Sequence, residues 1–314
     1  WQDRGDAPDW QRLLERREPL PAGVVPAGAL VLTVGIDNQA SPERLEASVW
    51  AWSEGYTSWL VDTKQIVGSP AADGPWDEIA ALMATDWPVE GGGTMQIAKA
   101  AADTGGQHTA GVYAQLRRLR DPRIVPVKGV PGWNKASPVT GPTLVDVTER
   151  GRKIKRGLRL WTVAVDVFKA DLYRRLHLGL GEDGSVPTGW VHLPEWMQPE
   201  HVQQLVAEEL VSIQDRRGFA KQEWQKRRAN EQLDMAVYAR AALSVLGSDR
   251  YGDRFWKRFR KEPDEGGGSP PPDETPPAPA APRVNFTSPI APPALVPAAK
   301  PEPGPRPTRA SRYA

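Results

Sequence analysis

Residues 30–37, LVLTVGID, form the most apolar strand-like run of the chain, and this run ends on an aspartate. A nearly continuous series of Leu, Val and Ile is typical of a strand that is buried on both faces of a sheet. Residues 45–52 and 58–67 follow at short intervals and together are rich in Val, Ile and Trp. The short connections predict that these three strands form an antiparallel meander.

Beyond the meander, strand-like and helical patterns alternate. Further strands are predicted at residues 95–103, 123–128 and 158–165. Apolar residues at helical spacing predict helices at residues 112–119, 168–176, 200–213 and 229–246. Three antiparallel strands, then alternating strands and helices, then a terminal helix, is the order of a ribonuclease-H-like fold. The sequence therefore predicts a mixed α/β sheet that is flanked by helices.

Composition divides the 314 residues into four parts. Residues 1–28 indicate a short amphipathic helix and a Pro-rich connector, and residues 29–246 the folded unit. Residues 247–261 form a basic and aromatic segment. Residues 262–314 are so rich in Pro and Ala that they offer little apolar surface for folding. We therefore expect this last part to be a disordered tail.

Bulk properties exclude several classes of site. Cys is absent, which excludes disulfides and thiolate metal sites and fits a reducing cytoplasm. No apolar run is long enough to cross a bilayer, so no membrane partner is expected. The net charge is only +1, and nucleic-acid binding would therefore depend on local clusters. The first residue is Trp rather than Met, and we expect a part of the protein upstream of it.

Three aspartates stand at positions that suit one site. Asp37 ends the most apolar strand, Asp103 ends the fourth strand, and Asp234 lies early in the last helix. A carboxylate at the end of a buried strand is costly unless it has a partner or a cation. If the fold brings the three together, their repulsion raises their pKa values, and Mg²⁺ or Mn²⁺ relieves it. Two such ions can activate water and stabilise the leaving oxygen of a phosphodiester.

Each aspartate also has a simpler interpretation. Asp103, in Asp-Thr-Gly-Gly, can cap the backbone amides of a turn, and Asp37 can be an ordinary loop residue. Asp234 can be a solvated helix residue. Taken alone, Asp103 and Asp234 fit these simpler roles better than a metal site. A shared site is favoured because three separate elements each begin or end with an aspartate.

A second tier of residues lies near these aspartates in the sequence. Glu231 can be a fourth ligand or an acid favoured by the helix dipole, and it shares a helical face with Asp234. Asp166 follows a strand and precedes a helix, which predicts an N-cap. Lys169 and Lys128 can contact phosphate or be solvated.

Basic clusters are the candidates for contact with DNA. Lys226, Arg227 and Arg228 lead directly into the helix of Asp234, where contacts with phosphate would be useful. Basic residues also cluster at residues 117–120, 152–156 and 254–261. Such runs are usually solvated faces. The four histidines lack the spacing of a zinc site. No GxxxxGK[ST] phosphate loop is present, so ATP binding by these residues is not expected.

Six ordered segments resemble the nuclease region of the lambda-type large terminase subunits, the GpA family. They are LTVGIDNQ with RLEASVWAW, SWLVDTKQIVGSP, ADTGGQHTAGVY, IVPVKG, TVAVDVFKADLYRRL and KRRANEQLDMAVYARAAL. The likeness covers residues 1–246. By this resemblance Asp37 matches the metal-binding aspartate of the first strand, Asp234 that of the NExLD segment, and Asp103 the DTGG aspartate.

The family implies a two-part motor subunit, in which an N-terminal ATPase translocates DNA and a ribonuclease-H-like nuclease cuts concatemers into genome lengths. It implies two Mg²⁺ or Mn²⁺ ions as cofactors. It also implies double-stranded DNA, the terminase small subunit and the procapsid portal as partners, in the cytoplasm of the bacterial host. The sequence departs from the family where Ala229 interrupts an RRNE-like run and where the Pro-rich tail has no counterpart. The ATPase is expected upstream of these residues.

Two other functions fit the same fold. A non-catalytic DNA-binding and assembly module of the motor would not need the three acids, and a metal titration would identify it. A ribonuclease-H-fold resolvase or recombinase would use the same acids, and selectivity for branched DNA would identify it. The ordered resemblance favours the nuclease of a packaging motor.

Overall fold

The structure is a computed structural model that describes most of the first 260 residues. The described ranges are residues 7–133, 137–149, 151–214 and 218–260. The predicted disordered tail lies outside these ranges and stays a prediction. Among the helices within them, none combines the length and the apolar character needed to span a membrane.

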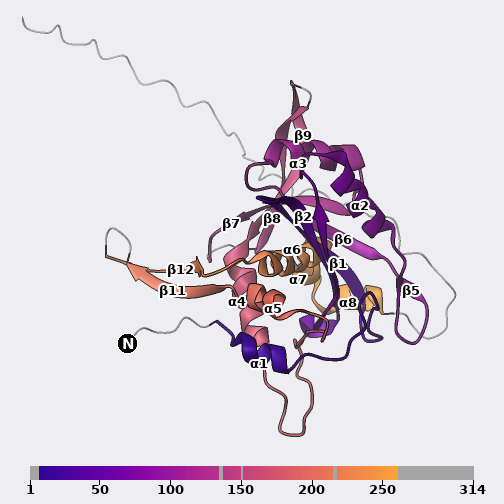
Figure 1. Cartoon of the computed structure of the whole chain (residues 1–314), viewed down its shortest axis with the longest axis vertical. Coiled ribbons are helices and arrows are strands. Elements are labelled where there is room, and N and C mark those ends of the chain that lie inside the picture. Colours follow the sequence, from indigo (N-terminus) through magenta and orange to yellow (C-terminus); the bar gives the residue numbers. More distant parts are fainter. Residues whose placement is uncertain (1–6, 134–136, 150, 215–217, 261–314) are drawn as a thin grey trace, which may run out of the picture. The chain divides into compact units, whose positions relative to one another are not determined.

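An eight-stranded mixed sheet forms the centre of the described part, in the order β10-β3-β2-β1-β6-β7-β9-β8 (Figure 1). β1 (Val31–Ala40), β2 (Glu43–Trp52) and β3 (Ser58–Val67) are successive antiparallel neighbours. The predicted meander is therefore confirmed. Its strands pair closely because only short connections separate them, as in a hairpin.

The other half of the sheet is mainly parallel. β6 (Ile97–Asp103) lies parallel to β1, and β7 (Ile124–Val130) and β9 (Arg152–Ala164) continue in the same direction. β8 (Val139–Glu149) is the antiparallel edge strand beside β9, and β10 (Val191–His192) closes the opposite edge beside β3. An antiparallel meander joined to parallel strands confirms the predicted ribonuclease-H-like order.

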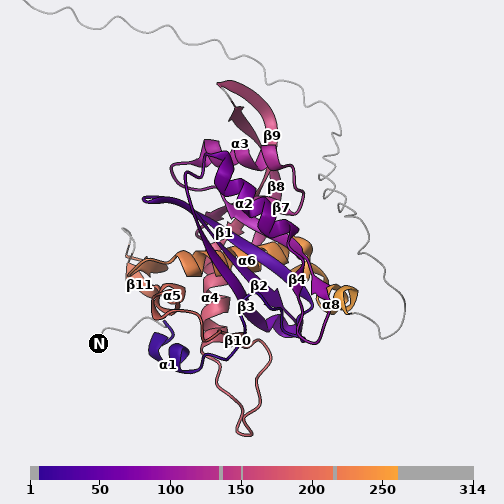
Figure 2. The ribbon, with the colours of Figure 1, turned by 45° about the vertical axis from the view of Figure 1, so that its right-hand side comes forward.

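Helices cover both faces of the sheet, and each face has its own core (Figure 2). On one face α2 (Asp73–Ala84) and α3 (Thr109–Leu119) pack against the alternate residues of β1 that include Leu32 and Val34. The other face is covered by α4 (Val165–Leu176), α5 (Pro199–Leu205) and α6 (Glu231–Leu246). Strands with apolar residues on both faces are what two helical layers require.

The predicted helix over residues 200–213 is wrong in its second half. α5 ends at Leu205, and β11 (Glu208–Gln214) then pairs with β12 (Ala220–Lys226) in a separate two-stranded hairpin. The residues EELVSIQ alternate along β11, and Leu210 lies opposite Trp224. Cross-strand pairing of this kind outweighs the helical propensity of Glu and Leu. Residues 73–84 and 139–149 form a helix and a strand that the sequence patterns did not predict.

Shorter elements complete the described part. They are α1 (Trp10–Glu15), the 3-10 turn η1 (Glu54–Tyr56), β4 (Trp87–Pro88), β5 (Thr94–Met95), α7 (Ser248–Tyr251) and α8 (Asp253–Phe259). Leu13 of α1 and Phe255 of α8 are buried in the core on the α6 side of the sheet. The segments on both sides of residues 29–246 therefore add to this core.

Candidate active site

Asp37 and Asp103 lie next to each other at one end of the sheet. β1 and β6 run parallel with Ile36 opposite Ala102, and the two aspartates are the next residue on each strand. Asp37 is buried, with 5% of its surface exposed, and Asp103 is half-buried. The two strands thus bring together acids that are 66 residues apart in the sequence.

Gly35 allows α6 to lie directly on β1. A Cβ atom at this position would stand 1.8 Å from the carbonyl oxygen of Met235 and 2.8 Å from the amide nitrogen of Ala239. The Thr33 hydroxyl donates a hydrogen bond of 2.8 Å to the Ala239 carbonyl. Side chains two residues apart on a strand share a face, so Asp37 faces the same helix. Asp234 precedes Met235 and is carried to the end of β1 by this close contact.

The pKa values show that the three aspartates form one electrostatic group. Burial raises the pKa of Asp37 well above 3.8, and the charges of Asp234 and Asp103 raise it further. Burial raises the pKa of Asp234 to about 6; Lys169 opposes this shift, whereas Glu208 and Asp103 add to it. The three residues predicted to share a site are therefore neighbours.

Asp103 also fulfils the simpler role that its turn suggested. Burial raises its pKa, while hydrogen bonds from the backbone amide of Gly105 and the hydroxyl of Tyr238 oppose the shift. The Asn38 amide nitrogen lies 3.2 Å from the Asp103 carbonyl oxygen. Tyr238 is buried and its pKa is raised well above 10, mainly by burial, so its hydroxyl remains a neutral donor. Tyr238 stands one helical turn after Asp234, and this spacing could have identified it in the sequence.

The donor set suits a hard divalent cation in chemical type and in charge. Carboxylate oxygens are the ligands that Mg²⁺ and Mn²⁺ prefer, and a cation would offset the repulsion that raises these pKa values. Asp37 accepts a hydrogen bond of 2.5 Å from the Gln39 amide. Within the described ranges, no three His, Asp or Glu side chains already stand in a metal-holding arrangement. The three aspartates therefore interact electrostatically, but their carboxylate oxygens do not surround one common point.

A chain of contacts leads from Asp234 to a buried lysine. The Asn230 amide donates to Oδ2 of Asp234 at 2.9 Å and to Oε1 of Glu208 at 2.8 Å. Lys169 Nζ lies 2.7 Å and 2.8 Å from the two carboxylate oxygens of Glu208. The Tyr173 hydroxyl donates to the Glu208 carbonyl at 2.9 Å. Asp234 is thereby held from α4 and from the start of β11, in addition to its own helix.

Glu208 was not among the predicted site residues. The pattern of residues 200–213 suggested a helix, whereas Glu208 is the first residue of β11 and is 4% exposed. A helical reading places Glu208 on a solvated face, and nothing in the local sequence indicates its contact with Lys169. The alternation of EELVSIQ is the signal that could have placed it at the start of a strand.

The second-tier residues have mixed outcomes. The N-cap prediction for Asp166 is wrong, because Ala164 precedes the helix and Asp166 is its second residue. Its buried carboxylate instead accepts a hydrogen bond of 2.6 Å from the amide of Gly132, in the segment after β7. Lys169 is not solvated but buried. Lys128 is exposed within β7.

Glu231 is buried at the first position of α6. Its Oε1 lies 3.8 Å from the Arg44 guanidinium, which in turn lies 2.5 Å from Glu46. The other oxygen of Glu231 is buried and has no hydrogen-bond partner among the described residues. Glu46 pairs with Asp37 in the sheet, so Arg44 and these acids lie beside the three aspartates. Whether Glu231 is a ligand stays a prediction.

The basic run Lys226, Arg227 and Arg228 joins β12 to α6 and is exposed. The Arg227 guanidinium contacts Glu209 at 3.0 Å, and that of Arg228 contacts Gln203 at 3.1 Å. The run lies at the base of the β11–β12 hairpin, close in sequence to Asn230. Its contact with DNA stays a prediction.

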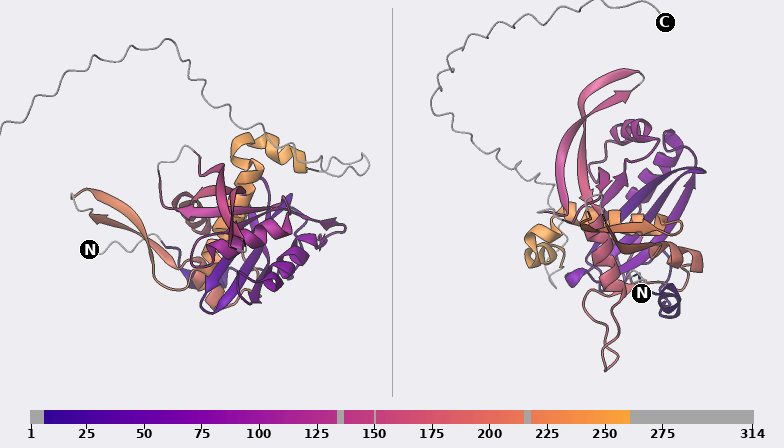
Figure 3. Two further views of the ribbon diagram at one scale, coloured as in Figure 1. Left: turned by 90° about the horizontal axis from the view of Figure 1, so that it is seen from above. Right: turned by 90° about the vertical axis from the view of Figure 1, so that its left-hand side faces the viewer.

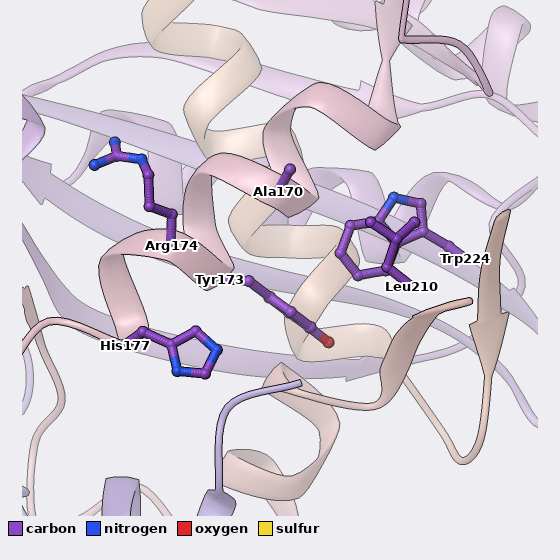
Figure 4. Close-up of a pocket in the computed structure, with 6 residues that line it drawn as sticks. All are labelled: Ala170, Tyr173, Arg174, His177, Leu210 and Trp224. Atoms are coloured by element: carbon purple, nitrogen blue, oxygen red, sulfur yellow. The ribbon is translucent and has the colours of Figure 1, made fainter. Parts of the chain in front are cut away.

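A hollow of about 330 Å³ lies between α4 and the β11–β12 hairpin (Figure 4). Its lining residues are Ala170, Tyr173, Arg174, His177, Leu210 and Trp224. Tyr173 and Trp224 meet edge to face, with ring centroids 5.1 Å apart. None of the three aspartates lines this hollow. It is connected to the acid site through Tyr173, whose hydroxyl donates to the Glu208 carbonyl.

A comparison with known protein families identifies the family of the chain. The sequence pattern of the family described as "Terminase large subunit gpA, endonuclease domain" matches residues 1–255. The chain belongs to this family. It is 32% identical to the terminase large subunit of Escherichia phage lambda over 247 residues, which cover 77% of the chain and 36% of that protein.

A second relative, the terminase large subunit of Enterobacteria phage P21, is 33% identical over 250 residues, covering 78% of the chain and 37% of that protein. The chain therefore spans about a third of the length of these curated relatives. Among solved structures it is similar to the large terminase nuclease of thermophilic phage G20c, at 10% identity and a TM-score of 0.40, covering 74% of the chain and 98% of the other. A magnesium-bound form gives a TM-score of 0.40 and 12% identity, covering 74% and 97%. These structural likenesses are too distant to bear on the site.

Proposed function

We propose that the chain is a divalent-metal-dependent endonuclease that cuts concatemeric double-stranded DNA into genome-length units during packaging. The observation that carries this proposal is the group of three aspartates from β1, β6 and α6, whose charges and burial raise the pKa of Asp37. Like charges are kept together at a partly buried place when a function requires them there. Membership of the terminase endonuclease family supports the same reading.

In this proposal Asp37, Asp103 and Asp234 hold Mg²⁺ or Mn²⁺, with two ions as the expected number. Ions of this kind activate a water molecule and stabilise the leaving oxygen of a phosphodiester. Asn230 orients the carboxylate of Asp234 through its hydrogen bond of 2.9 Å. The Tyr238 hydroxyl donates to Asp103 and fixes the side of that carboxylate that faces α6.

The wider context is part of the same proposal, because the chain spans only about a third of its relatives. We propose that it works with an upstream ATPase domain, the terminase small subunit and the procapsid portal, in the cytoplasm of the bacterial host. These residues themselves are not expected to bind ATP. Calorimetry with ATP tests this point, and saturable micromolar binding would contradict it.

A non-catalytic DNA-binding module is the second candidate. It is favoured by the lack, within the described ranges, of acidic side chains already arranged to hold a metal ion. Incubation of linear duplex DNA with the chain in Mg²⁺, Mn²⁺ or EDTA, with calorimetric titration of each metal, separates the two. The nuclease requires saturable metal binding and metal-dependent cleavage. Duplex binding without either result would favour the module.

A further inference from the structure

The β8–β9 ribbon continues beyond the rest of the sheet (Figure 3). β9 pairs with β7 only over residues 161–164, so its residues 152–160 pair with β8 alone. We call residues 143–149 and 152–160 the basic arm. It leaves the sheet as a two-stranded ribbon, with β8 as the edge strand.

The basic arm carries a surplus of positive charge, whereas the rest of the chain does not. Its exposed cations are Arg152, Lys153, Lys155, Arg156 and Arg159. By sequence, residues 143–160 hold six basic and two acidic residues, a net charge of +4 in a chain of +1. Of these cations, the described structure pairs Lys153 with Asp146, at 3.0 Å. A surplus of cations on a projecting ribbon is the electrostatic footprint of a polyanion partner.

Helix α3 braces the base of the basic arm. The Arg117 guanidinium donates a hydrogen bond of 2.8 Å to the Gly157 carbonyl. A Cβ atom on Gly157 would stand 2.7 Å from that guanidinium and 3.2 Å from the Val147 side chain. Leu160 at the base of the arm is 9% exposed, and Val147, which pairs with Ile154 in its outer half, is 1% exposed, so buried apolar residues support the charged ribbon. The cations are therefore presented from an ordered ribbon.

We infer that the basic arm is a second duplex-binding surface, which contacts the DNA backbone at a distance from the three aspartates. A two-stranded ribbon has the width that a DNA groove admits, and Lys and Arg on it can reach phosphates. The identity of the polyanion as duplex DNA rests on the proposed function.

The sheet register allows the distance between the basic arm and Asp103 to be calculated. Asp103 lies level with Val127, and Val127 lies level with Trp161 of β9. Arg156 precedes Trp161 by five residues, about 17 Å along the strand, and two strand spacings add about 10 Å sideways. Together these two displacements place Arg156 roughly 20 Å from Asp103 and Arg152 roughly 30 Å from it. At about 3.4 Å per base pair, the arm reaches DNA about 6–9 base pairs from the cut.

The test compares two triple variants of equal charge change. The first is Arg152→Gln, Lys155→Gln and Arg156→Gln in the basic arm. The matched control is Lys64→Gln, Arg174→Gln and Arg250→Gln, three exposed cations on other elements. Fluorescence anisotropy with a linear duplex in EDTA, at several salt concentrations, measures binding without cleavage.

We expect the arm variant to lose about 2–3 units of the slope of log K against log salt, at about 0.9 unit per lost phosphate contact. The control should lose less than about one unit. At saturating DNA, the cleavage rate of the arm variant should stay within about twofold, because the three aspartates are unchanged. Since binding is measured without metal, failure of cleavage would sink the proposed nuclease and leave the arm to be judged separately.

Shortened duplexes test the reach. On DNA that ends about 4 base pairs from the cut on both sides, the arm variant and the unchanged protein should bind alike, whereas about 12 base pairs should restore the difference. An unchanged salt slope, or an equal loss in the control, would overturn the inference. It would be overturned as well if the arm variant altered only self-association in size-exclusion chromatography, because the arm would then be a protein contact.

Discussion

The acid site, formed by β1, β6 and α6, and the basic arm, formed by β8 and β9, involve strands of one sheet but differ in the surroundings of their charges. At the acid site, like charges share a buried place, and the pKa of Asp234 rises to about 6. In the arm, like charges stand in water, where a neighbouring charge is screened. The acid site therefore depends on the tertiary fold to hold it together, whereas the arm depends mainly on its local sequence.

Two ion pairs make the difference concrete. Lys169 and Glu208, beside the acids, have side chains that are 9% and 6% exposed. Lys153 and Asp146, in the arm, have side chains that are 66% and 44% exposed. Removing one partner of a buried pair leaves an uncompensated charge, whereas an exposed charge is solvated at once. Effects on folding and cleavage should therefore concentrate at the acid site.

The largest effect is expected from the aspartates. Asp37→Asn or Asp234→Asn should reduce cleavage of linear duplex DNA in Mg²⁺ or Mn²⁺ by about a thousandfold or more, because a bound metal contributes several kcal/mol to this chemistry. The melting temperature should hold or rise, since one of several repelling charges is lost. Asp183→Asn, on an exposed loop, is the matched control and should cleave normally. Full activity of either site variant, with its fold confirmed, would end the metal proposal.

Replacing lysines should separate the two regions next. Lys169→Gln should lower the free energy of unfolding by about 3–5 kcal/mol, because the buried charge of Glu208 would lose its cation and keep the neutral Asn230 amide as a partner. Lys153→Gln should leave the unfolding midpoint unchanged. Denaturant titration of both variants checks this. Adding Glu208→Gln to the first variant should recover part of the loss, and equal effects of the two lysines would contradict the comparison.

Gly35 tests how closely α6 must lie on β1. Gly35→Ala should cost about 3 kcal/mol of stability, because its Cβ would meet the Met235 carbonyl and the helix would have to move. Gly74 in α2 has nothing within 4 Å of an added Cβ and offers the control. Gly74→Ala should be neutral or slightly stabilising, as expected for alanine in a helix. Thermal melts decide between these outcomes, and an unchanged melt for Gly35→Ala would disprove the tight contact.

The smallest expected effect is the pH dependence of stability. Since the pKa of Asp234 rises from 3.8 to about 6, the folded protein binds more protons than the unfolded chain in that window. The contribution of Asp234 should therefore lower the free energy of unfolding as pH rises from about 4 to 6, and Asp234→Asn should remove this slope.

Binding of Mg²⁺ should depend on pH in the opposite sense. Mg²⁺ at a hundred times its Kd should add about 2.7 kcal/mol to the free energy of unfolding at pH 7 and little at pH 4. Thermal melts of the unchanged protein and of Asp234→Asn at each pH, with and without Mg²⁺, test both expectations. Stabilisation of Asp234→Asn by Mg²⁺ would count against the proposed metal site.

Sequence alone predicted the antiparallel meander, the strands and helices that alternate after it, and the aspartates near the ends of the strands. These features follow from apolar runs of strand length and from turn residues, which act within about ten residues of one another. The positions of Asp37 and Asp103 could be predicted because Asp103 ends β6 and Asp37 ends the buried part of β1, although β1 itself continues to Ala40. The resemblance also named the terminase endonuclease family, and the family comparison confirms that the chain belongs to it.

Only the tertiary structure decided what surrounds these acids. Lys169 and Glu208 are 39 residues apart and Asn230 lies 22 residues beyond Glu208, so no local pattern shows that they meet. The same holds for Asp166, whose carboxylate binds an amide 34 residues away instead of capping its own helix. Hydrophobic periodicity sets which face of an element is buried, but a buried polar group takes whichever partner the packing of other elements brings within reach.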